Sequence, residues 1–239
     1  MTDSLYAAFE LIASGNASLV SIVGRSLAVS ALAVLIGGFI GVWLGAWLGV
    51  ARYAGRPVVI AVLNSFLAVP SVVVGLVVYL LLSRSGPLGF LGWLFSFPAM
   101  VVAQTLLVLP VVTALTRQLV ESAESTHGEQ WRSLGAGTMW RSVLLAFDER
   151  HALFMVFVTA FSRAITEVGA VMIVGGNIDG FTRVMTTAIA LETSKGDLPL
   201  ALALGLVLLA VMFALNGLAA VVQYARSRAD SYAPQGRSA

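Results

Sequence analysis

The sequence predicts an all-α integral membrane protein with about five transmembrane helices, and three observations support this fold class. The 239-residue chain is 59% hydrophobic and only 11% charged, whereas a soluble domain carries about 25% charged residues. Its apolar stretches reach or exceed the roughly 20 residues that a helix needs to cross a bilayer. The polar segments between these stretches are too short to form a separate soluble domain.

Apolar spans alternate with polar connections along the chain. Residues 4–13 have apolar side chains at helical spacing, which predicts a short amphipathic helix at the membrane interface. The five predicted spans cover residues 20–50, 57–82, 98–119, 152–174 and 198–222. The chain therefore divides into an interfacial helix (1–18), a transmembrane domain (19–225) and a polar cytoplasmic tail (226–239) that we expect to be disordered.

Two of the spans contain residues that affect helix packing. In the first span, glycines recur every four residues, at Gly37, Gly41, Gly45 and Gly49. This smooth stripe predicts the close approach of another helix rather than a ligand site. In the second span, Pro70 predicts a kink, because proline removes one backbone hydrogen bond.

The basic residues predict the orientation of the chain. Five spans place the two termini on opposite sides of the membrane. If residues 121–150 are cytoplasmic, that side carries most of the basic residues: Arg52, Arg56, Arg117, Arg132, Arg141, Arg150, Arg226, Arg228 and Arg237. The positive-inside rule then places the N-terminus outside and the C-terminus in the cytoplasm.

The longest polar interruption, residues 121–150, is the first candidate functional segment. We expect the preceding helix to end near Gly128, a short helical piece to cover residues 129–134, and a turn to follow at Gly135 and Gly137. Residues 139–147 then have the apolar spacing of a second amphipathic helix. This pattern fits either a docking element for a soluble partner or an interfacial loop that joins two spans.

The fourth span is the second candidate, because it contains Arg163 and Glu167. Charged residues inside a membrane are costly and are candidates for function. Their i, i+4 spacing predicts an ion pair on one helix face. The spacing alone does not decide between a transport role and a structural ion pair.

Several kinds of chemistry are excluded or disfavoured. The absence of cysteine excludes disulfides, thiolate metal sites and cysteine nucleophiles. The chain has no P-loop motif, so it cannot supply an ATP site of that kind. His127 and His151 have no further ligand at metal-binding spacing, so we expect no metal. No motif supplies the nucleophile and base that an intramembrane hydrolase needs, so we expect the chain not to be an enzyme.

A resemblance to a known family comes from residues 161–177, FSRAITEVGAVMIVGGN. This segment resembles a signature of the molybdate, sulfate and tungstate permeases of ABC transporters. The matching residues are Phe161, Arg163, Ala164, Glu167, Gly169, Ala170, Gly176 and Asn177. The segment that follows and residues 70–89 look most like the tungstate branch. The resemblance extends from about residue 20 to 225.

Residues 121–150 also resemble the EAA loop of ABC importer permeases. Glu129 and Gly135 match the glutamate and glycine of that loop's pattern at the expected spacing. Gln130 and Trp131 replace its two alanines, and its terminal Ile-x-Leu-Pro is absent. In that family the loop forms a coupling helix that docks into an ATPase subunit. The resemblance implies that this contact involves Glu129, Gln130, Trp131, Arg132, Ser133, Leu134 and Gly135.

The resemblance implies a type I importer permease that works as a homodimer in a bacterial or archaeal cytoplasmic membrane. Separate ATPase subunits would bind ATP and Mg, so this chain needs no cofactor, and an outer binding protein would deliver an oxyanion, tungstate before molybdate or sulfate. The chain would contact lipid and no nucleic acid. The implied path residues are Arg163, Glu167, Gly169, Gly175, Gly176 and Asn177. The alternative is a gradient-driven secondary anion carrier, which the lack of a clear internal repeat disfavours.

Overall fold

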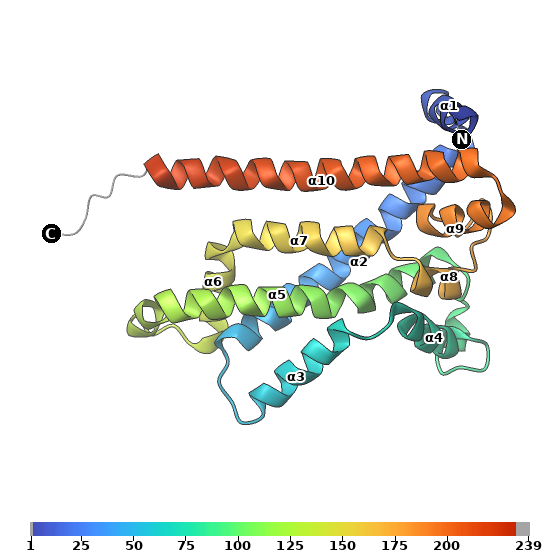
Figure 1. Cartoon of the computed structure of the whole chain (residues 1–239). Coiled ribbons are helices and arrows are strands. Elements are labelled where there is room, and N and C mark those ends of the chain that lie inside the picture. The colour runs from blue at the N-terminus through green and yellow to red at the C-terminus, as the bar shows by residue number, and fades with distance from the viewer. Residues whose placement is uncertain (1, 233–239) are drawn as a thin grey trace.

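A computed structural model describes residues 2–232, in which helices are the only regular secondary structure (Figure 1). In chain order the helices are α1 (Thr2–Ala13), α2 (Ala17–Val50), α3 (Arg56–Leu67), α4 (Ser71–Leu82), the 3-10 turn η1 (Gly89–Leu91), α5 (Phe97–Ser133), α6 (Thr138–Asp148), α7 (Arg150–Ile165), α8 (Gly169–Gly175), α9 (Met185–Lys195) and α10 (Leu198–Tyr232). Helices α2, α5 and α10 are each long and apolar enough to cross a membrane. If each of the bent pairs α3–α4 and α7–α8 is one span, the described residues contain up to five spans, and the predicted all-α membrane class is confirmed.

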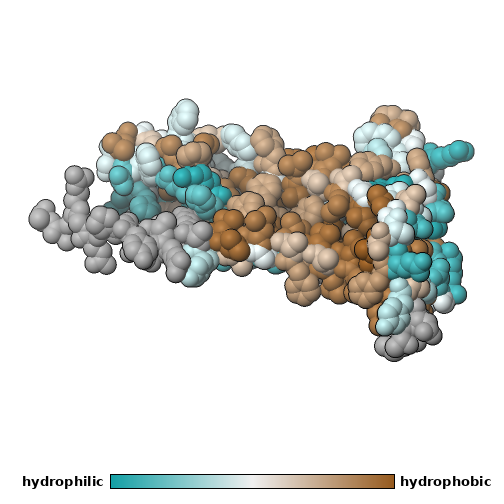
Figure 2. All heavy atoms as spheres, turned by 90° about the horizontal axis from the view of Figure 1, so that it is seen from above, coloured by the Kyte–Doolittle hydropathy of each residue, from teal (hydrophilic) through white to brown (hydrophobic). Residues whose placement is uncertain are grey.

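Three helices define one long axis of the molecule. Helices α5, α7 and α10 run roughly parallel in the view of Figure 1, and α2 crosses behind them. Helix α6 lies at one end of the molecule, together with the C-terminal part of α10, whereas α1, α4, α8 and α9 lie at the other end. Figure 2 shows hydrophobic residues in a belt across the middle and hydrophilic residues at both ends, as expected for a chain that spans a bilayer.

The glycine stripe of α2 packs against α5, as predicted. A Cβ atom added at Gly41 would lie 2.8 Å from Cβ of Val112, and one added at Gly45 would lie 2.5 Å from the backbone oxygen of Thr113. Both distances are shorter than an ordinary van der Waals contact, so the two backbones approach as closely as they do only because these positions carry no side chain.

Pro70 produces a larger change than the predicted kink. Helices α3 and α4 meet at 96°, so the second span is two nearly perpendicular helices. Pro70 occupies the N-cap of α4 with extended backbone angles, and proline has no N–H to continue the hydrogen bonds of α3. Proline also disfavours helical angles at the residue before it, so the break at this point follows from local chemistry.

The polar segment differs from the prediction at Gly128. Helix α5 continues through Gly128 to Ser133, so residues 129–133 are its last turn and not a separate helical piece. A Cβ atom at Gly128 would lie 2.6 Å from Cδ of Glu124, so glycine leaves room for this carboxyl group instead of breaking the helix. The predicted turn is confirmed at Gly135, which has a φ of +80°, and α6 is the predicted second helix.

The two ends of the chain also contain helix. Helix α1 packs its buried Ala8 into a cluster with residues of α2, α9 and α10. Its position at a membrane interface stays a prediction. Helix α10 continues to Tyr232, so the first part of the tail is helical rather than disordered. The rest of the tail, residues 233–239, lies outside the described residues.

Candidate functional site

The first candidate region is the elbow between α5 and α6, which we define as residues 129–148. The turn is closed by two backbone hydrogen bonds, in which Gly135 N–H donates to Arg132 O (2.9 Å) and Ala136 N–H donates to Trp131 O (3.0 Å). Only glycine adopts the positive φ at position 135 without strain. The chain therefore reverses direction sharply, and α6 folds back against α5 and α2.

A buried carboxylate of α5 holds the two arms of this elbow together. The side chain of Glu124 is 3% exposed, and its Oε1 lies 2.9 Å from Arg132 Nη2 and 3.0 Å from Arg141 Nη1. Arg132 belongs to the last turn of α5 and Arg141 to α6, so one carboxylate joins both arms of the elbow. The sequence analysis did not single out Glu124, because Arg132 and Arg141 lie 8 and 17 positions away from it and form no local pattern with it.

A second charge cluster lies one turn earlier on α5, beyond its apolar part. Glu121 contacts Arg56 (2.8 Å), Arg117 and, more distantly, Arg52 (3.9 Å). Burial alone would raise the pKa of the Glu121 carboxyl, but the hydrogen bond from Arg56 and the three arginine charges outweigh it and lower that pKa. Glu121 is therefore ionised at neutral pH. We define these four residues as the Glu121 cluster.

The outer surface of the elbow combines polar and apolar side chains. Most of the predicted coupling residues are exposed: Glu129, Gln130, Arg132, Ser133, Leu134 and Gly135. Trp131 is partly buried and packs against the cluster around Val120 and Leu145. Leu134 and Trp140 are 71% and 70% exposed, so the elbow presents large apolar side chains at the polar end of the molecule. The sequence analysis placed Trp140 in an amphipathic helix but not in the contact surface.

The second candidate region is the break between α7 and α8. Helix α7 ends at Ile165, and α8 starts at Gly169 after a bend of 58°. Here the structure corrects the prediction of one continuous span. The break also separates Arg163 from Glu167, and no ion pair joins them within residues 2–232. Glu167 Oε1 instead accepts a hydrogen bond from Ala170 N–H (3.2 Å), while Arg163 is exposed.

Two broken spans meet at this point. A Cβ atom at Gly75 of α4 would lie 2.7 Å from Cα of Ala170 in α8, and one at Gly169 would lie 2.7 Å from Val72 Cγ2. The bends at Pro70 and at residues 166–168 therefore bring α4 and α8 into backbone contact. Non-helical backbone at membrane depth is tolerated where it is buried in protein or lines a cavity.

Hydrogen bonds from threonine side chains fix the backbone of the segment after α8. Thr182 Oγ1 bonds Gly175 O (2.5 Å), and Thr186 Oγ1 bonds the backbone oxygen of Glu167 (2.7 Å). Asn177 has a φ of +50° and donates from Nδ2 to Thr187 O (3.3 Å). The predicted path residues Glu167, Gly169, Gly175, Gly176 and Asn177 thus come together around α8, whereas Arg163 lies at the end of α7 before the bend.

A cleft lined by both apolar and polar side chains extends along α7 towards the elbow. It has a volume of about 410 Å³ between α5, α7 and α10, and Gln118, Ser122, Thr159 and Gln223 are among its lining residues. Thr159 is one helical turn from Arg163, so both side chains lie on the same side of α7. The cleft thus ends one turn from the exposed arginine.

Within the described residues, no group of three or more His, Cys, Asp and Glu side chains could hold a metal ion. His127 and His151 lie at the elbow end of the molecule, on α5 and α7 respectively, and both are exposed. His151 lines a small pocket of about 100 Å³ next to that cleft, with Met155 and Gln223.

No family model matches the chain. The chain is similar to curated transport proteins over most of its length. It is 44% identical over 216 residues to the tungstate uptake system permease protein TupB of Peptoclostridium acidaminophilum, which covers 90% of this chain and 95% of the relative. It is 37% identical over 214 residues to the protein of that name from Campylobacter jejuni, covering 90% of each chain. It is 30% identical over 187 residues to the molybdenum transport system permease protein ModB of Escherichia coli, covering 72% of this chain and 80% of the relative.

Proposed function

Because this chain belongs to the molybdate, sulfate and tungstate family of ABC-transporter permeases, we propose that it forms the membrane pathway of an ATP-driven tungstate importer. The observation that carries the substrate is the 44% identity with a tungstate uptake permease across 95% of that relative. A second copy of the chain completes the pathway. The N-terminus lies outside and the C-terminus in the cytoplasm, as the arginine distribution favours.

The elbow is the contact for an ATPase subunit on the cytoplasmic side. Its exposed Leu134 and Trp140 are anchors that a groove on a soluble partner would bury. Its stiffness comes from Glu124, which ties the last turn of α5 to α6. Because α5 is a single helix of 37 residues, a displacement of the elbow is transmitted along it to the membrane-embedded part of the span.

The oxyanion passes along the face of α7 that carries Arg163. Arg163 is exposed in the single chain and forms no ion pair with a described residue, so its charge is open to a dianion that enters between two copies. Glu167 acts differently, because its carboxylate accepts the N–H of Ala170 and fixes the bend that brings α8 against α4. Arg163 therefore attracts the anion, and Glu167 maintains the broken backbone beside it.

Site-specific cross-linking tests the elbow contact. The chain has no cysteine, so Trp140→Cys introduces a single thiol. In native membranes, a bifunctional reagent should join this thiol to a co-extracted protein that carries a P-loop. Tyr6→Cys is the matched control, because Tyr6 is 77% exposed on α1 at the opposite end. Equal cross-linking of both variants to the same ATPase, or none from Trp140→Cys, contradicts the proposed contact.

Competition between anions tests the substrate. The assay measures uptake of radiolabelled tungstate by cells that produce the complete transporter. Unlabelled molybdate should lower this uptake only when its concentration is well above that of tungstate. If molybdate competes as effectively as tungstate at equal concentration, the restriction to tungstate is wrong, while the oxyanion class stands.

A further inference from the structure

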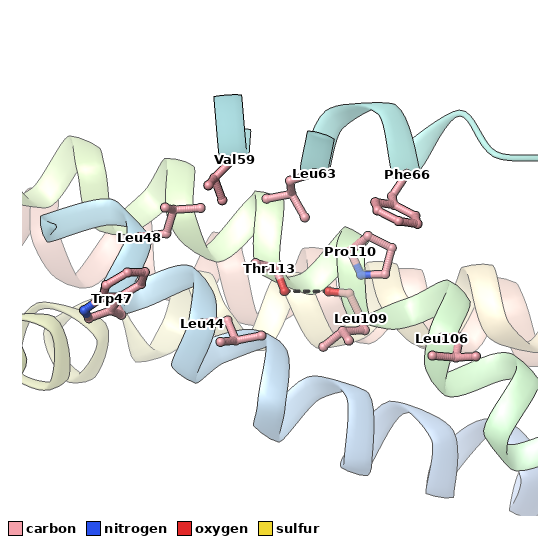
Figure 3. A pocket seen from close by; sticks show the side chains of 10 residues that line it. All are labelled: Leu44, Trp47, Leu48, Val59, Leu63, Phe66, Leu106, Leu109, Pro110 and Thr113. Atoms are coloured by element: carbon pink, nitrogen blue, oxygen red, sulfur yellow. Dashed lines mark hydrogen bonds between the residues drawn. The ribbon is translucent and has the colours of Figure 1, made fainter. Parts of the chain in front are cut away.

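An apolar cavity of about 380 Å³ lies between α2, α3 and α5, and the proposed transport pathway does not use it (Figure 3). Pockets that bind small molecules span roughly 300–1,000 Å³, so this one is large enough for part of a ligand. It is lined by Leu44, Trp47, Leu48, Val59, Leu63, Phe66, Leu106, Leu109, Pro110 and Thr113. The hydroxyl of Thr113 already donates to Leu109 O at 2.7 Å, so the indole N–H of Trp47, a residue that is 40% exposed, is the one lining side-chain donor left for a polar group.

Helix α3 separates this cavity from the surroundings of the protein. Figure 3 shows Val59, Leu63 and Phe66 of α3 facing the cavity opposite Leu48 and Pro110. No residue of α3 is fully buried, and its outward face is apolar, with Val58 66% exposed. In a chain that spans a bilayer this face meets lipid, so acyl chains have direct access to the sides of the cavity.

One end of the cavity adjoins the Glu121 cluster. The carbonyl of Leu48, a lining residue, accepts a hydrogen bond from Arg56 Nε at 3.2 Å. Three arginines share one carboxylate in this cluster, which leaves a formal excess of two positive charges. Arg52 is the most exposed of the three, because its side chain is 60% exposed and its Nη1 lies 3.9 Å from Glu121 Oε1. Arg117 Nε is buried and has no hydrogen-bond partner.

Two aromatic residues lie at the end of the cavity that adjoins the Glu121 cluster. Trp47 lines the cavity and stacks on Tyr53 at a centroid distance of 5.5 Å, in the connection that leads to Arg56. Tryptophan and tyrosine are enriched where hydrocarbon meets headgroups. The cavity therefore has an apolar body within the hydrocarbon layer and a cationic mouth at its boundary.

We propose that this cavity is a binding site for an anionic phospholipid, with one acyl chain between α3 and the α2–α5 pair and the phosphate against Arg52 and Arg56. The apolar lining matches an acyl chain, and the charge excess matches the headgroup. Basic pockets between transmembrane helices on the cytoplasmic side are a recognised mode of anionic lipid binding. The lipid fills the space under a helix that has no buried residue of its own, so it supports the bent α3–α4 span.

Lipid retention during purification tests the site. The full chain is extracted in mild detergent, mixed with equal amounts of phosphatidylglycerol and phosphatidylcholine, and washed, and the retained lipid is quantified by mass spectrometry. Phosphatidylglycerol should be retained in preference, at about one molecule per chain. Arg52→Gln should lower its retention about fivefold, the effect of one arginine at a lipid headgroup. Arg84→Gln, an exposed arginine beyond α4, should leave it unchanged.

A second variant tests the cavity itself. Leu63→Trp places a larger apolar side chain inside it and should displace the lipid while Arg52 and Arg56 remain. Equal retention of both lipids, or full retention of phosphatidylglycerol in Leu63→Trp and Arg52→Gln, overturns the proposal. So does loss of self-association in Leu63→Trp without a change in bound lipid, because the cavity would then be occupied by a second copy. Each of these outcomes leaves the tungstate pathway untouched, since none measures transport.

Discussion

Replacing Glu124 with glutamine should loosen the attachment of α6 to α5. The substitution keeps the size of the side chain but removes the charge that Arg141 and Arg132 share at 3.0 and 2.9 Å. Arg132 is 57% exposed and can turn to water, whereas Arg141 is 11% exposed and stays beside an uncharged group. Breaking a buried ion pair from one side costs about 3–5 kcal/mol. We expect the lower end of this range, because the amide of glutamine still accepts a hydrogen bond.

Amide hydrogen exchange of α6 measures this effect directly. A loss of about 3 kcal/mol in the free energy of local opening corresponds to roughly 100-fold faster exchange, at 1.4 kcal/mol per factor of ten. The amides of Thr138–Asp148 should show this increase in Glu124→Gln. Glu129→Gln is the control, since Glu129 lies on α5 like Glu124 but is exposed. In this variant the amides of α6 should exchange at the rate of the unchanged chain.

A double variant separates lost pairing from general damage. In Glu124→Gln combined with Arg141→Gln, no unpaired charge remains in the buried site, so α6 should exchange more slowly than in the single Glu124→Gln variant. If Glu124→Gln leaves the exchange of α6 within twofold of the unchanged chain, the carboxylate does not fasten the elbow and the reasoning fails.

Three further predictions concern packing, charge and pH. Gly45→Ala places a Cβ atom 2.5 Å from Thr113 O, an overpacking that costs about 1–3 kcal/mol, so the apparent melting temperature in detergent should fall; Gly24→Ala on the same helix, with nothing within 4 Å, should not lower it. Arg163→Gln should abolish tungstate uptake without disassembling the complex, and Arg163→Lys should restore part of it, whereas normal uptake in Arg163→Gln excludes the proposed role. The pKa of Glu121 is lowered in the folded state from its ordinary value of 4.5, so the ionised carboxylate stabilises the fold at pH values above 4.5. This contribution is lost as the pH falls below 4.5 towards the folded-state pKa. Thermal stability should therefore fall less steeply with acid in Glu121→Gln than in the unchanged chain, and identical acid profiles contradict the prediction.

The sequence predicted the features that depend on composition and spacing along the chain. Long apolar runs specify α2, α5 and α10, because a helix needs an apolar stretch of about 20 residues to cross a bilayer. The four-residue glycine spacing likewise predicted a close helix contact, since such residues fall on one face. Gly135 as a turn residue was predictable for a similar reason, because glycine has the backbone freedom that the turn requires.

The features that sequence reasoning missed depend on contacts between distant residues. Gly128 suggested a helix break on propensity alone, but the space it leaves for the carboxyl of Glu124 keeps α5 continuous. The Arg163–Glu167 pair followed from an assumed continuous helix, whereas packing of α8 on Gly75 of α4 bends the chain between them. Neither contact has a signature within a short window of sequence.

Some predictions about the site rest on partners that the single chain does not contain. The exposure of Glu129 and Leu134 fits a docking surface, and the exposure of Arg163 fits a pathway between two copies. Both roles stay proposals until a complex is tested. The cleft beside Thr159 and the apolar cavity near Arg52 were not predicted, because each is built from three helices that the sequence does not place side by side.

Reconstituted transport tests the central claim most directly. Proteoliposomes are prepared with this chain alone and with this chain plus its co-purified ATPase and binding protein, and tungstate uptake is measured with and without ATP. We expect uptake only in the complete assembly, with ATP on the side of the elbow and tungstate on the other side. Uptake by the chain alone, driven by an ion or anion gradient and indifferent to ATP, would show that it works as a secondary carrier and would contradict the account.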